Sequence, residues 1–207
     1  MGASKKICIL NYGSGNTQSV FNMFLTIADN VVVSNKTEDI ASATHIILPG
    51  VGAFGSSMEK IRKNIPLDIL EKEVLKNNKP FLGICVGMQV LAEKGYEFGE
   101  YEGLGWIPGS VEKMAAGNLP LPHIGWNNIS IVKKTPLLEQ LDGNQDFYFV
   151  HSYKFKEKDE GNVIAKTEYG QEFNSIIGKN NIFGVQFHPE KSQKAGKALL
   201  KNFVNLS

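Results

Sequence analysis

The sequence predicts an α/β fold in which a mostly parallel sheet carries helices on both faces. In the first half, short apolar runs alternate with helical patterns, as in chains that build parallel sheets. A cysteine framed by glycines, Gly83-Ile84-Cys85-Val86-Gly87, stands where a strand runs into a helix. The second half is rich in short β segments, which favours a mixed or antiparallel extension of the sheet.

The first half supplies the parallel strands and their helices. An apolar run at residues 7–10 ends in the glycine-rich turn 11–16, which leads into a helical pattern. The same alternation then repeats up to the cysteine. Strands are expected at residues 7–10, 31–33, 44–48 and 80–84, and helices at 17–27, 54–64, 66–76 and, after the cysteine, 88–94.

The second half supplies mostly β structure and one closing helix. Its segments are short and rich in β-branched and aromatic residues. Strands are expected at residues 111–114, 129–132, 146–150, 153–155, 163–167, 173–177 and 182–186, and the closing helix at 192–204.

Length and composition narrow the class of protein. The 207 residues suit one domain over 1–207, and 42% hydrophobic with 21% charged residues is ordinary for a globular chain. A net charge of +1 gives no general attraction to nucleic acid or to a membrane surface. Two cysteines, no signal peptide and no apolar run of about 20 residues favour a cytoplasmic protein.

The glycine-framed cysteine matches the pattern of a nucleophile elbow. The turn from strand to helix is sharp, so a side chain at Gly83 or Gly87 would collide with neighbouring backbone. An ordinary cysteine has a pKa of about 8.5 and is only slightly ionised at neutral pH, so a nucleophilic thiol needs help. The start of the following helix and a nearby histidine would both favour the thiolate.

His188 is the histidine with the most suggestive surroundings. It lies just past a predicted buried strand, where functional groups of open α/β sheets collect. Pro189 fixes the direction in which the chain leaves, and Glu190 shares a face with His188 if the segment is extended. The sequence therefore predicts a Cys85–His188–Glu190 triad.

Acyl transfer at a thiol also needs donors for the oxyanion. The backbone N–H of Val86, directly after the nucleophile, is one candidate. A second lies in the loop after the strand at 44–48, where two glycines flank Val51 and give its peptide unusual freedom. We therefore expect Val51 and Gly52 to complete the oxyanion hole.

Each of these residues also has an alternative, structural interpretation. Considered alone, Cys85 would as readily be a core residue as a nucleophile, while His188 would more often be structural and Glu190 solvated. Cys8, between two isoleucines, is an inert core residue. His123 and His151 have aromatic neighbours and no nearby carboxylate, so they are interpreted as scaffold or partner-contact residues. No metal-ligand spacing occurs, and Gln18 stands where a dinucleotide fingerprint needs its third glycine.

Taken together, the motifs resemble the class I (triad) glutamine amidotransferases, and among them the glutaminase subunits of imidazole glycerol phosphate synthase. The resemblance runs from about residue 5 to the C-terminus, and Val86 replaces a leucine common in the family. The motifs are residues 11–16, 48–55, 83–89, 122–127, 149–153 and 184–193.

The resemblance implies a flavodoxin-like fold and a reaction. Cys85 would attack the side-chain amide of glutamine, His188 would protonate the departing ammonia, and water would hydrolyse the thioester to glutamate. It also implies that Gln89, with the backbone near Gly52, Ser152 and Tyr153, contacts glutamine. It implies no cofactor and no metal.

The resemblance also implies a partner. Ammonia would pass to a (β/α)8 cyclase or synthase subunit in a heterodimer, which forms imidazole glycerol phosphate and aminoimidazole carboxamide ribotide in histidine biosynthesis. Asn11, Asn16, Trp126 and Lys191 would face that subunit, although Trp126 as a plain core residue stays open. The glutaminase would be nearly idle until the partner holds its ligand, and a flip of the Val51 peptide would complete the oxyanion hole.

Three rival functions remain at this stage. A paralogous glutaminase could serve a different synthase, such as a sugar-amidating enzyme of surface glycans, with the same catalytic residues. A partner-binding pseudoenzyme is disfavoured by the intact triad. A stand-alone cysteine hydrolase or chaperone of similar fold would usually lack the His-Pro-Glu segment.

Overall fold

A computed structural model describes residues 5–13, 15–141 and 145–206. Ser14, in the predicted turn 11–16, lies outside them. Within the described residues the main sheet has eight strands, of which the first five in spatial order are mutually parallel and the rest antiparallel. In that order they are β2 (Asn30–Ser34), β1 (Lys6–Leu10), β3 (His45–Gly50), β4 (Phe81–Cys85), β14 (Ile182–Val185), β13 (Gln171–Lys179), β12 (Val163–Tyr169) and β9 (Ser130–Ile131).

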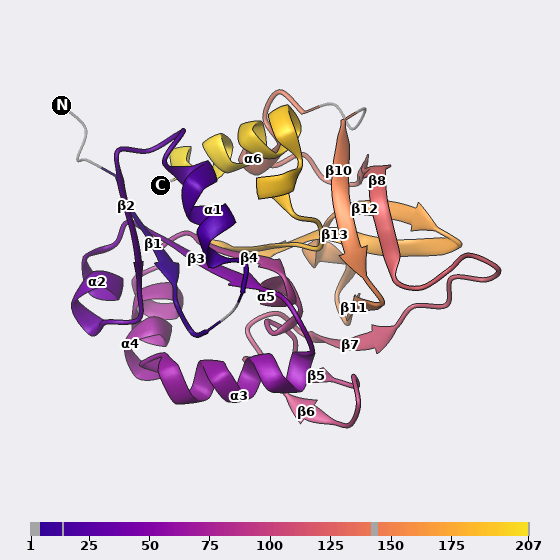
Figure 1. Cartoon of the computed structure of the whole chain (residues 1–207), viewed down its shortest axis with the longest axis horizontal. Coiled ribbons are helices and arrows are strands. Elements are labelled where there is room, and N and C mark those ends of the chain that lie inside the picture. The colour runs from indigo at the N-terminus through magenta and orange to yellow at the C-terminus, as the bar shows by residue number, and fades with distance from the viewer. Residues whose placement is uncertain (1–4, 14, 142–144, 207) are drawn as a thin grey trace.

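Helices cover both faces of this sheet, as predicted (Figure 1). The helices α1 and α6 lie on one side, and α3 and α4 lie on the other, with α2 against α4. Their bounds are α1 (Thr17–Phe24), α2 (Thr37–Ser42), α3 (Phe54–Asn64), α4 (Leu67–Glu71), α5 (Val86–Gln89) and α6 (Gln193–Asn205), and α4 continues in a π-helical turn, Lys72–Lys76. Among them, α2 was not predicted. No described helix has the length and apolar character needed to cross a membrane.

The remaining strands stand apart from the main sheet, so the second half is more than an extension of it. Among the described residues they form a two-stranded antiparallel ribbon and a four-stranded mixed sheet. The ribbon pairs β8 (His123–Asn128), which was not predicted, with β10 (Asp146–His151), and the four-stranded sheet runs β11 (Tyr153–Glu157), β7 (Gly109–Lys113), β5 (Lys94–Gly95) and β6 (Tyr101–Glu102).

The helix predicted at residues 88–94 is wrong beyond Gln89. The helix α5 ends there, and the chain runs into β5, an inner strand of the four-stranded sheet. The N–H groups of Glu93 and Tyr96 donate to the carbonyls of Gly109 and Val111 on β7, at 3.0 and 2.9 Å. Tertiary pairing thus takes the backbone groups that a longer helix would have used.

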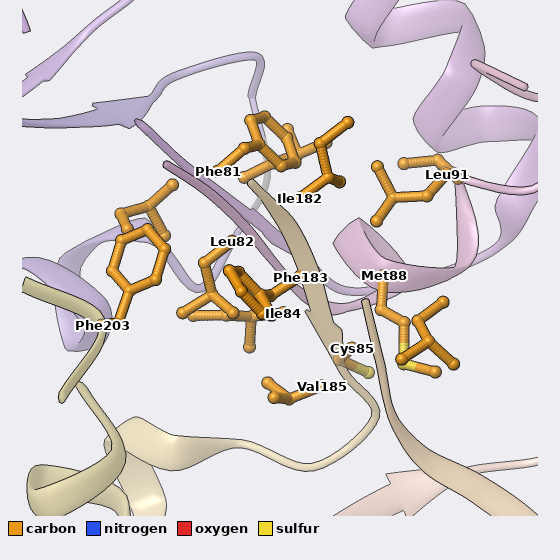
Figure 2. Close-up of a cluster of buried hydrophobic side chains, with 14 of the residues drawn as sticks. Phe81, Leu82, Ile84, Cys85, Met88, Leu91, Ile182, Phe183, Val185 and Phe203 are labelled. Atoms are coloured by element: carbon orange, nitrogen blue, oxygen red, sulfur yellow. The ribbon is translucent and has the colours of Figure 1, made fainter. Parts of the chain in front are cut away.

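The core lies between the parallel strands and their helices. Side chains of β4 and β14 point into it, and Phe203 of α6 packs from one side (Figure 2). Phe81, Leu82 and Ile84 are fully buried in this cluster. Cys85 is the last residue of β4, so the nucleophile candidate is mounted on a strand that is buried along its whole length.

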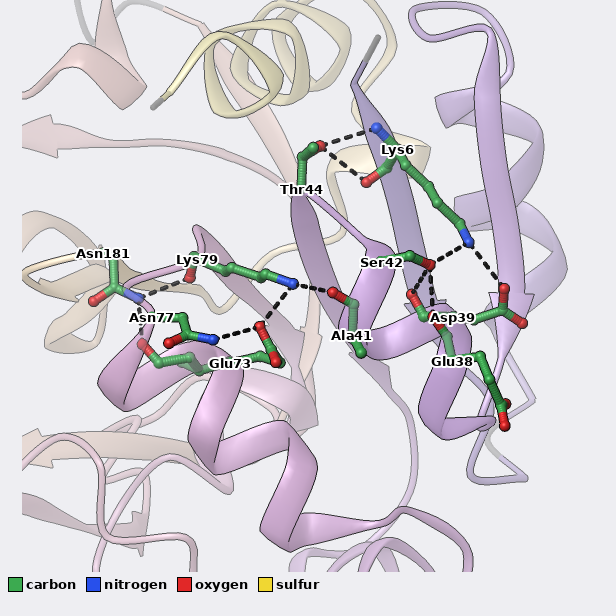
Figure 3. A network of polar contacts seen from close by, with 11 residues as sticks. Lys6, Glu38, Asp39, Ala41, Ser42, Thr44, Glu73, Asn77, Lys79 and Asn181 are labelled. Carbon is green, nitrogen blue, oxygen red and sulfur yellow. Dashed lines mark hydrogen bonds and ion pairs between the residues drawn. The ribbon is translucent and has the colours of Figure 1, made fainter. Parts of the chain in front are cut away.

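Polar contacts fix the amino-terminal ends of the strands (Figure 3). The hydroxyl of Thr44 accepts from the Lys6 N–H at 2.9 Å and donates to the Lys6 carbonyl at 3.0 Å, which joins β1 to the start of β3. The amide of Asn181 donates to the carbonyls of Val74 and Lys79 at 2.8 and 2.7 Å. These contacts help to fix where the parallel strands start relative to one another.

The two glycines of the elbow are required by close backbone contact, as the sequence predicts. A Cβ atom on Gly87 would lie 1.8 Å from the carbonyl oxygen of Leu48 on β3, and one on Gly83 would lie 2.3 Å from the carbonyl oxygen of Gly87. Both obstacles are backbone atoms and cannot rotate away. The turn after β4 can therefore form only where these positions carry no side chain.

Replacing Gly87 with Ala tests this contact. Because Leu48 and the turn must separate, the free energy of unfolding should fall by about 3 kcal/mol, measured by urea denaturation. Gly15→Ala is the control, since its Cβ would meet only Val51 Cγ2 at 3.8 Å. Equal urea midpoints for the two variants would contradict the contact.

Candidate active site

Three neighbouring parallel strands deliver the candidate catalytic groups to one edge of the sheet. Gly50 at the end of β3 pairs in register with Cys85 at the end of β4, and Ile84 pairs with Val185 of β14. The carboxyl ends of parallel strands face the same side, where ligands of open α/β sheets bind. The loop after Gly50, the thiol of Cys85 and the segment leading to His188 therefore leave the sheet side by side.

Cys85 sits in the strained conformation expected of an elbow. Its φ is 55° and its ψ is −112°, which places an L-residue in a backbone region that favours glycine. The side chain is 4% exposed, and the amide of Gln186 donates to its Sγ at 3.8 Å. Cys85 thus lies at the border between the buried cluster and the cavity described below.

His188 and Glu190 form the predicted contact as a buried pair, but a 3-10 turn, Pro189–Lys191, brings them together in place of the extended segment expected. His188 Nδ1 lies 2.8 Å from Glu190 Oε1, and both side chains are fully shielded from solvent. His188 Nε2 makes no hydrogen bond of ordinary geometry among the described residues. With Nδ1 taken by the carboxylate, Nε2 is the ring nitrogen left for chemistry.

The charge state of His188 follows from its neighbours. Burial lowers its pKa, but the hydrogen bonds and charges of Cys85 and then Glu190 outweigh burial and raise the pKa to about 10. A raised pKa means that the imidazolium form persists through neutral pH. Cys85 and His188 line one cavity, and Glu190 contacts His188, so the three predicted triad residues lie at one site.

A fourth residue holds the triad carboxylate. Asn16, at the start of α1, donates its side-chain amide to Glu190 Oε1 at 2.5 Å and lies 3.4 Å from His188 Nδ1. It is 8% exposed, so most of its surface faces inward. Sequence reasoning assigned Asn16 to the partner surface and missed this contact, because 174 residues separate Asn16 from Glu190.

The backbone of His188 is fixed from β10. The His188 N–H donates to the carbonyl of Tyr148 at 2.8 Å. The buried hydroxyl of Ser192 accepts from the Tyr148 N–H at 3.0 Å and donates to the His188 carbonyl at 2.6 Å. A single residue of β10 thus clamps the whole turn that presents His188 and Glu190.

A cavity of about 240 Å³ opens over the thiol. It brings together the predicted oxyanion and substrate residues, and it adds three that sequence reasoning did not assign to the site. The predicted ones are Val51, Gly52, Cys85, Val86, Gln89, Ser152, Tyr153 and His188, and the additional ones are Glu97, Val150 and His151.

Glu97 brings a carboxylate to this cavity. Its Oε2 accepts from the Phe54 N–H at 2.8 Å, and burial raises the pKa of the carboxyl despite that bond. Gln89 lies deeper: its amide donates to the Tyr153 carbonyl at 3.0 Å and to Gln186 Oε1 at 3.1 Å. Nothing in the spacing around Glu97 marks it as a site residue, since it reaches the cavity only through the fold.

The residues predicted to face a partner lie near the triad turn. Trp126 is 48% exposed on β8, which argues against the core interpretation, and its ring meets Tyr148 edge-on at 5.9 Å. The ammonium of Lys191 lies 5.6 Å from the centre of the Tyr148 ring. Asn11 is exposed at the end of β1. Among the described residues, no three side chains gather as metal ligands would.

A triad of this kind, with an elbow cysteine and a histidine–glutamate pair on a mostly parallel sheet, defines a thiol-dependent amide-transfer class. The family model for class-I glutamine amidotransferases matches residues 8–206, and the chain belongs to that family. Within it, the chain is 44% identical over 201 residues to the imidazole glycerol phosphate synthase subunit HisH 1 of Campylobacter jejuni (strain RM1221), covering 97% of this chain and 100% of that one.

Other comparisons agree with this placement. The imidazole glycerol phosphate synthase subunit HisH of Methanocaldococcus jannaschii is 45% identical over 200 residues, covering 97% of this chain and 99% of that one. Among solved structures, PurLQS from Thermotoga maritima superposes with a TM-score of 0.75 at 17% identity, covering 98% of each chain. That likeness concerns the fold alone.

Replacing Glu190 with Gln tests the charge state of the pair. The variant keeps a side-chain partner for His188 but loses the negative charge that raises the pKa of the imidazole, so the pKa should fall. Because the imidazolium is the proton donor, the alkaline limb of the pH–activity profile should move to lower pH. Profiles of glutamine hydrolysis for both proteins measure the shift, and superimposable alkaline limbs would exclude this role.

Proposed function

We propose that this chain is the glutaminase subunit of an imidazole glycerol phosphate synthase. The observation that carries the proposal is the Cys85–His188–Glu190 arrangement beneath a cavity lined by the predicted substrate residues. Identities of 44% and 45% over nearly the whole chain to subunits of that synthase favour it over a paralogue serving a sugar-amidating enzyme. The intact buried triad argues against a pseudoenzyme.

In this mechanism the Cys85 thiolate attacks the side-chain amide carbon of glutamine. The oxyanion that forms lies where backbone N–H groups of Val86 and of the Val51–Gly52 loop can donate to it. The His188 imidazolium gives its Nε2 proton to the nitrogen, ammonia departs, and a thioester remains. Neutral His188 then takes a proton from water, which attacks the thioester and releases glutamate.

The cavity supplies the groups that glutamine needs. We assign the α-ammonium group to the carboxylate of Glu97, because opposite charge in a half-buried site gives strong, oriented hydrogen bonds. Gln89, Ser152 and Tyr153 line the same cavity. The substrate would then span the cavity with its amide at the thiol.

The ammonia is passed, in this proposal, to a (β/α)8 cyclase subunit in a heterodimer. Support comes from an exposed surface beside the triad turn, where Trp126 and Ile124 of β8 are 48% and 59% exposed. Lys191, next to Glu190, adds a positive charge, and exposed aromatic and basic residues are typical interface anchors. The partner roles of Asn11, Asn16, Trp126 and Lys191, a single domain over 1–207 and a cytoplasmic location stay predictions.

The decisive experiment measures glutaminase activity of the purified chain alone, with a candidate barrel subunit, and with that subunit plus its nucleotide ligand. We expect hydrolysis to rise strongly in the last case. Complementation of a histidine auxotroph separates the proposal from the glycan alternative. Hydrolysis that stays absent in every mixture, or labelling by a glutamine-mimicking electrophile that spares Cys85, would overturn it.

A Val51→Pro variant tests the oxyanion hole. Proline removes the N–H at this position, so partner-stimulated hydrolysis should fall by about 100-fold or more. Val51→Ala keeps the N–H and serves as the control. Full stimulated activity in the proline variant would show that the Val51 peptide takes no part.

A Glu97→Gln variant tests substrate recognition. The loss of a charged partner for the α-ammonium group should raise KM for glutamine by about tenfold, with a smaller change in kcat. Glu100→Gln is the matched control, because Glu100 is exposed and pairs with Lys94 outside the cavity. An unchanged KM would remove Glu97 from the substrate site.

A further inference from the structure

Two further histidines, His123 and His151, form a pair that lies beside the triad without belonging to it. The two residues face each other across the ribbon, paired in register on β8 and β10. They are 2% and 6% exposed, and His151 also lines the cavity over Cys85. This histidine pair has no part in the mechanism above.

The hydrogen bonds of the pair fix the tautomers of both rings. His151 Nδ1 lies 2.9 Å from the carbonyl oxygen of Tyr153, so Nδ1 carries the proton and donates it. In a neutral ring His151 Nε2 is then an acceptor, and His123 Nδ1, at 3.2 Å, donates to it. His123 thus donates a hydrogen bond to His151, which donates one to the Tyr153 carbonyl.

The surroundings keep both rings neutral. Burial lowers the pKa of His123 to about 4 and that of His151 to about 3. Aromatic rings enclose His123, which stacks on Tyr169 at 4.0 Å and on Phe149 at 5.0 Å between ring centres. The rings therefore cannot rotate freely, and the tautomers above hold at any pH near neutrality.

The Tyr153 carbonyl connects these hydrogen bonds to the substrate site. It receives a second donor, the amide of Gln89, at 3.0 Å. Gln89 also donates to Gln186, whose amide in turn contacts Cys85 Sγ. One carbonyl thus ties the cavity wall at 151–153 to the residues beneath the nucleophile.

A role in proton transfer is excluded by the same contacts. His151 Nδ1 is committed to a carbonyl and Nε2 to His123, so neither nitrogen can serve His188 or the substrate. With pKa values far below neutrality, neither ring accepts a proton during turnover. What remains for the pair is to hold the wall in place.

We infer that His123 and His151 are positioning residues for glutamine binding, which hold the Ser152–Tyr153 segment in the conformation that contacts the substrate. The inference rests on the proposed function. It assigns the pair to substrate affinity rather than to the chemical step, because its contacts end on the cavity wall and not on the triad.

The test compares His151→Leu with His151→Asn in the complex with the barrel subunit and its ligand. Leucine removes the donor to Tyr153, so KM for glutamine should rise by about tenfold, more than kcat falls. The Nδ2 of asparagine stands where Nδ1 stands in histidine and keeps the donor, so KM should recover to within about threefold of the parent value. His123→Leu, which leaves His151 Nε2 unpaired, should give an intermediate rise.

A second measurement separates positioning from damage to the triad. Iodoacetamide reaches Cys85 through the same cavity but lacks the α-ammonium and α-carboxylate groups of glutamine, so its rate reports the reactivity of the thiol rather than recognition of the amino acid. We expect the variants to change this rate much less than KM. An unchanged KM in His151→Leu, or equal KM values for the leucine and asparagine variants, would overturn the inference. So would an alkylation rate that falls by as large a factor as KM rises. A parent protein that fails to hydrolyse glutamine would instead refute the proposed function.

Discussion

The parallel pairing of β4 with β3 on one side and β14 on the other is the constraint on which the site depends. It places Gly50 opposite Cys85 and carries the chain from Val185 to His188 along the same sheet edge. The pairing is compatible with the elbow only because Gly87 lets α5 approach the backbone of β3. A cysteine in a strained conformation therefore persists because packed strands on both sides over-determine its position.

The electrostatics of the site follow from this burial. A protonated imidazole that is shielded from water is costly unless charged or polar partners surround it. His188 has Glu190 at 2.8 Å, and Glu190 in turn accepts from Asn16. The carboxylate acts on the ring, and Asn16 acts on the carboxylate. The histidine–glutamate part of the predicted triad is therefore pre-formed.

Short sequence patterns predicted the parts of the site whose residues lie close together in the sequence. The elbow depends on glycines within two residues of Cys85. The histidine–glutamate pair depends on residues two apart in the chain, although a 3-10 turn and not the expected extended stretch brings them together. Asn16 and Glu97 were not assigned to the site because they reach it only through strand order and loop packing. Strand β8 was missed because Gly125 and two asparagines weaken its β pattern, and its pairing with β10 supplies what the pattern lacks.

The parts of the site differ in how firmly they are held, and this difference bears on where a partner could control the proposed enzyme. An activating partner needs an element with two accessible arrangements. The His188–Glu190 pair is fully buried and clamped through Tyr148 and Ser192, and the histidine pair His123–His151 holds the 151–153 segment of the cavity wall. The Val51 side chain is instead 40% exposed, and the following Gly52 has a φ of +95° with open space around it. Control by the partner through the Val51 peptide stays a prediction, which the exposure of Val51 and the open space at Gly52 favour.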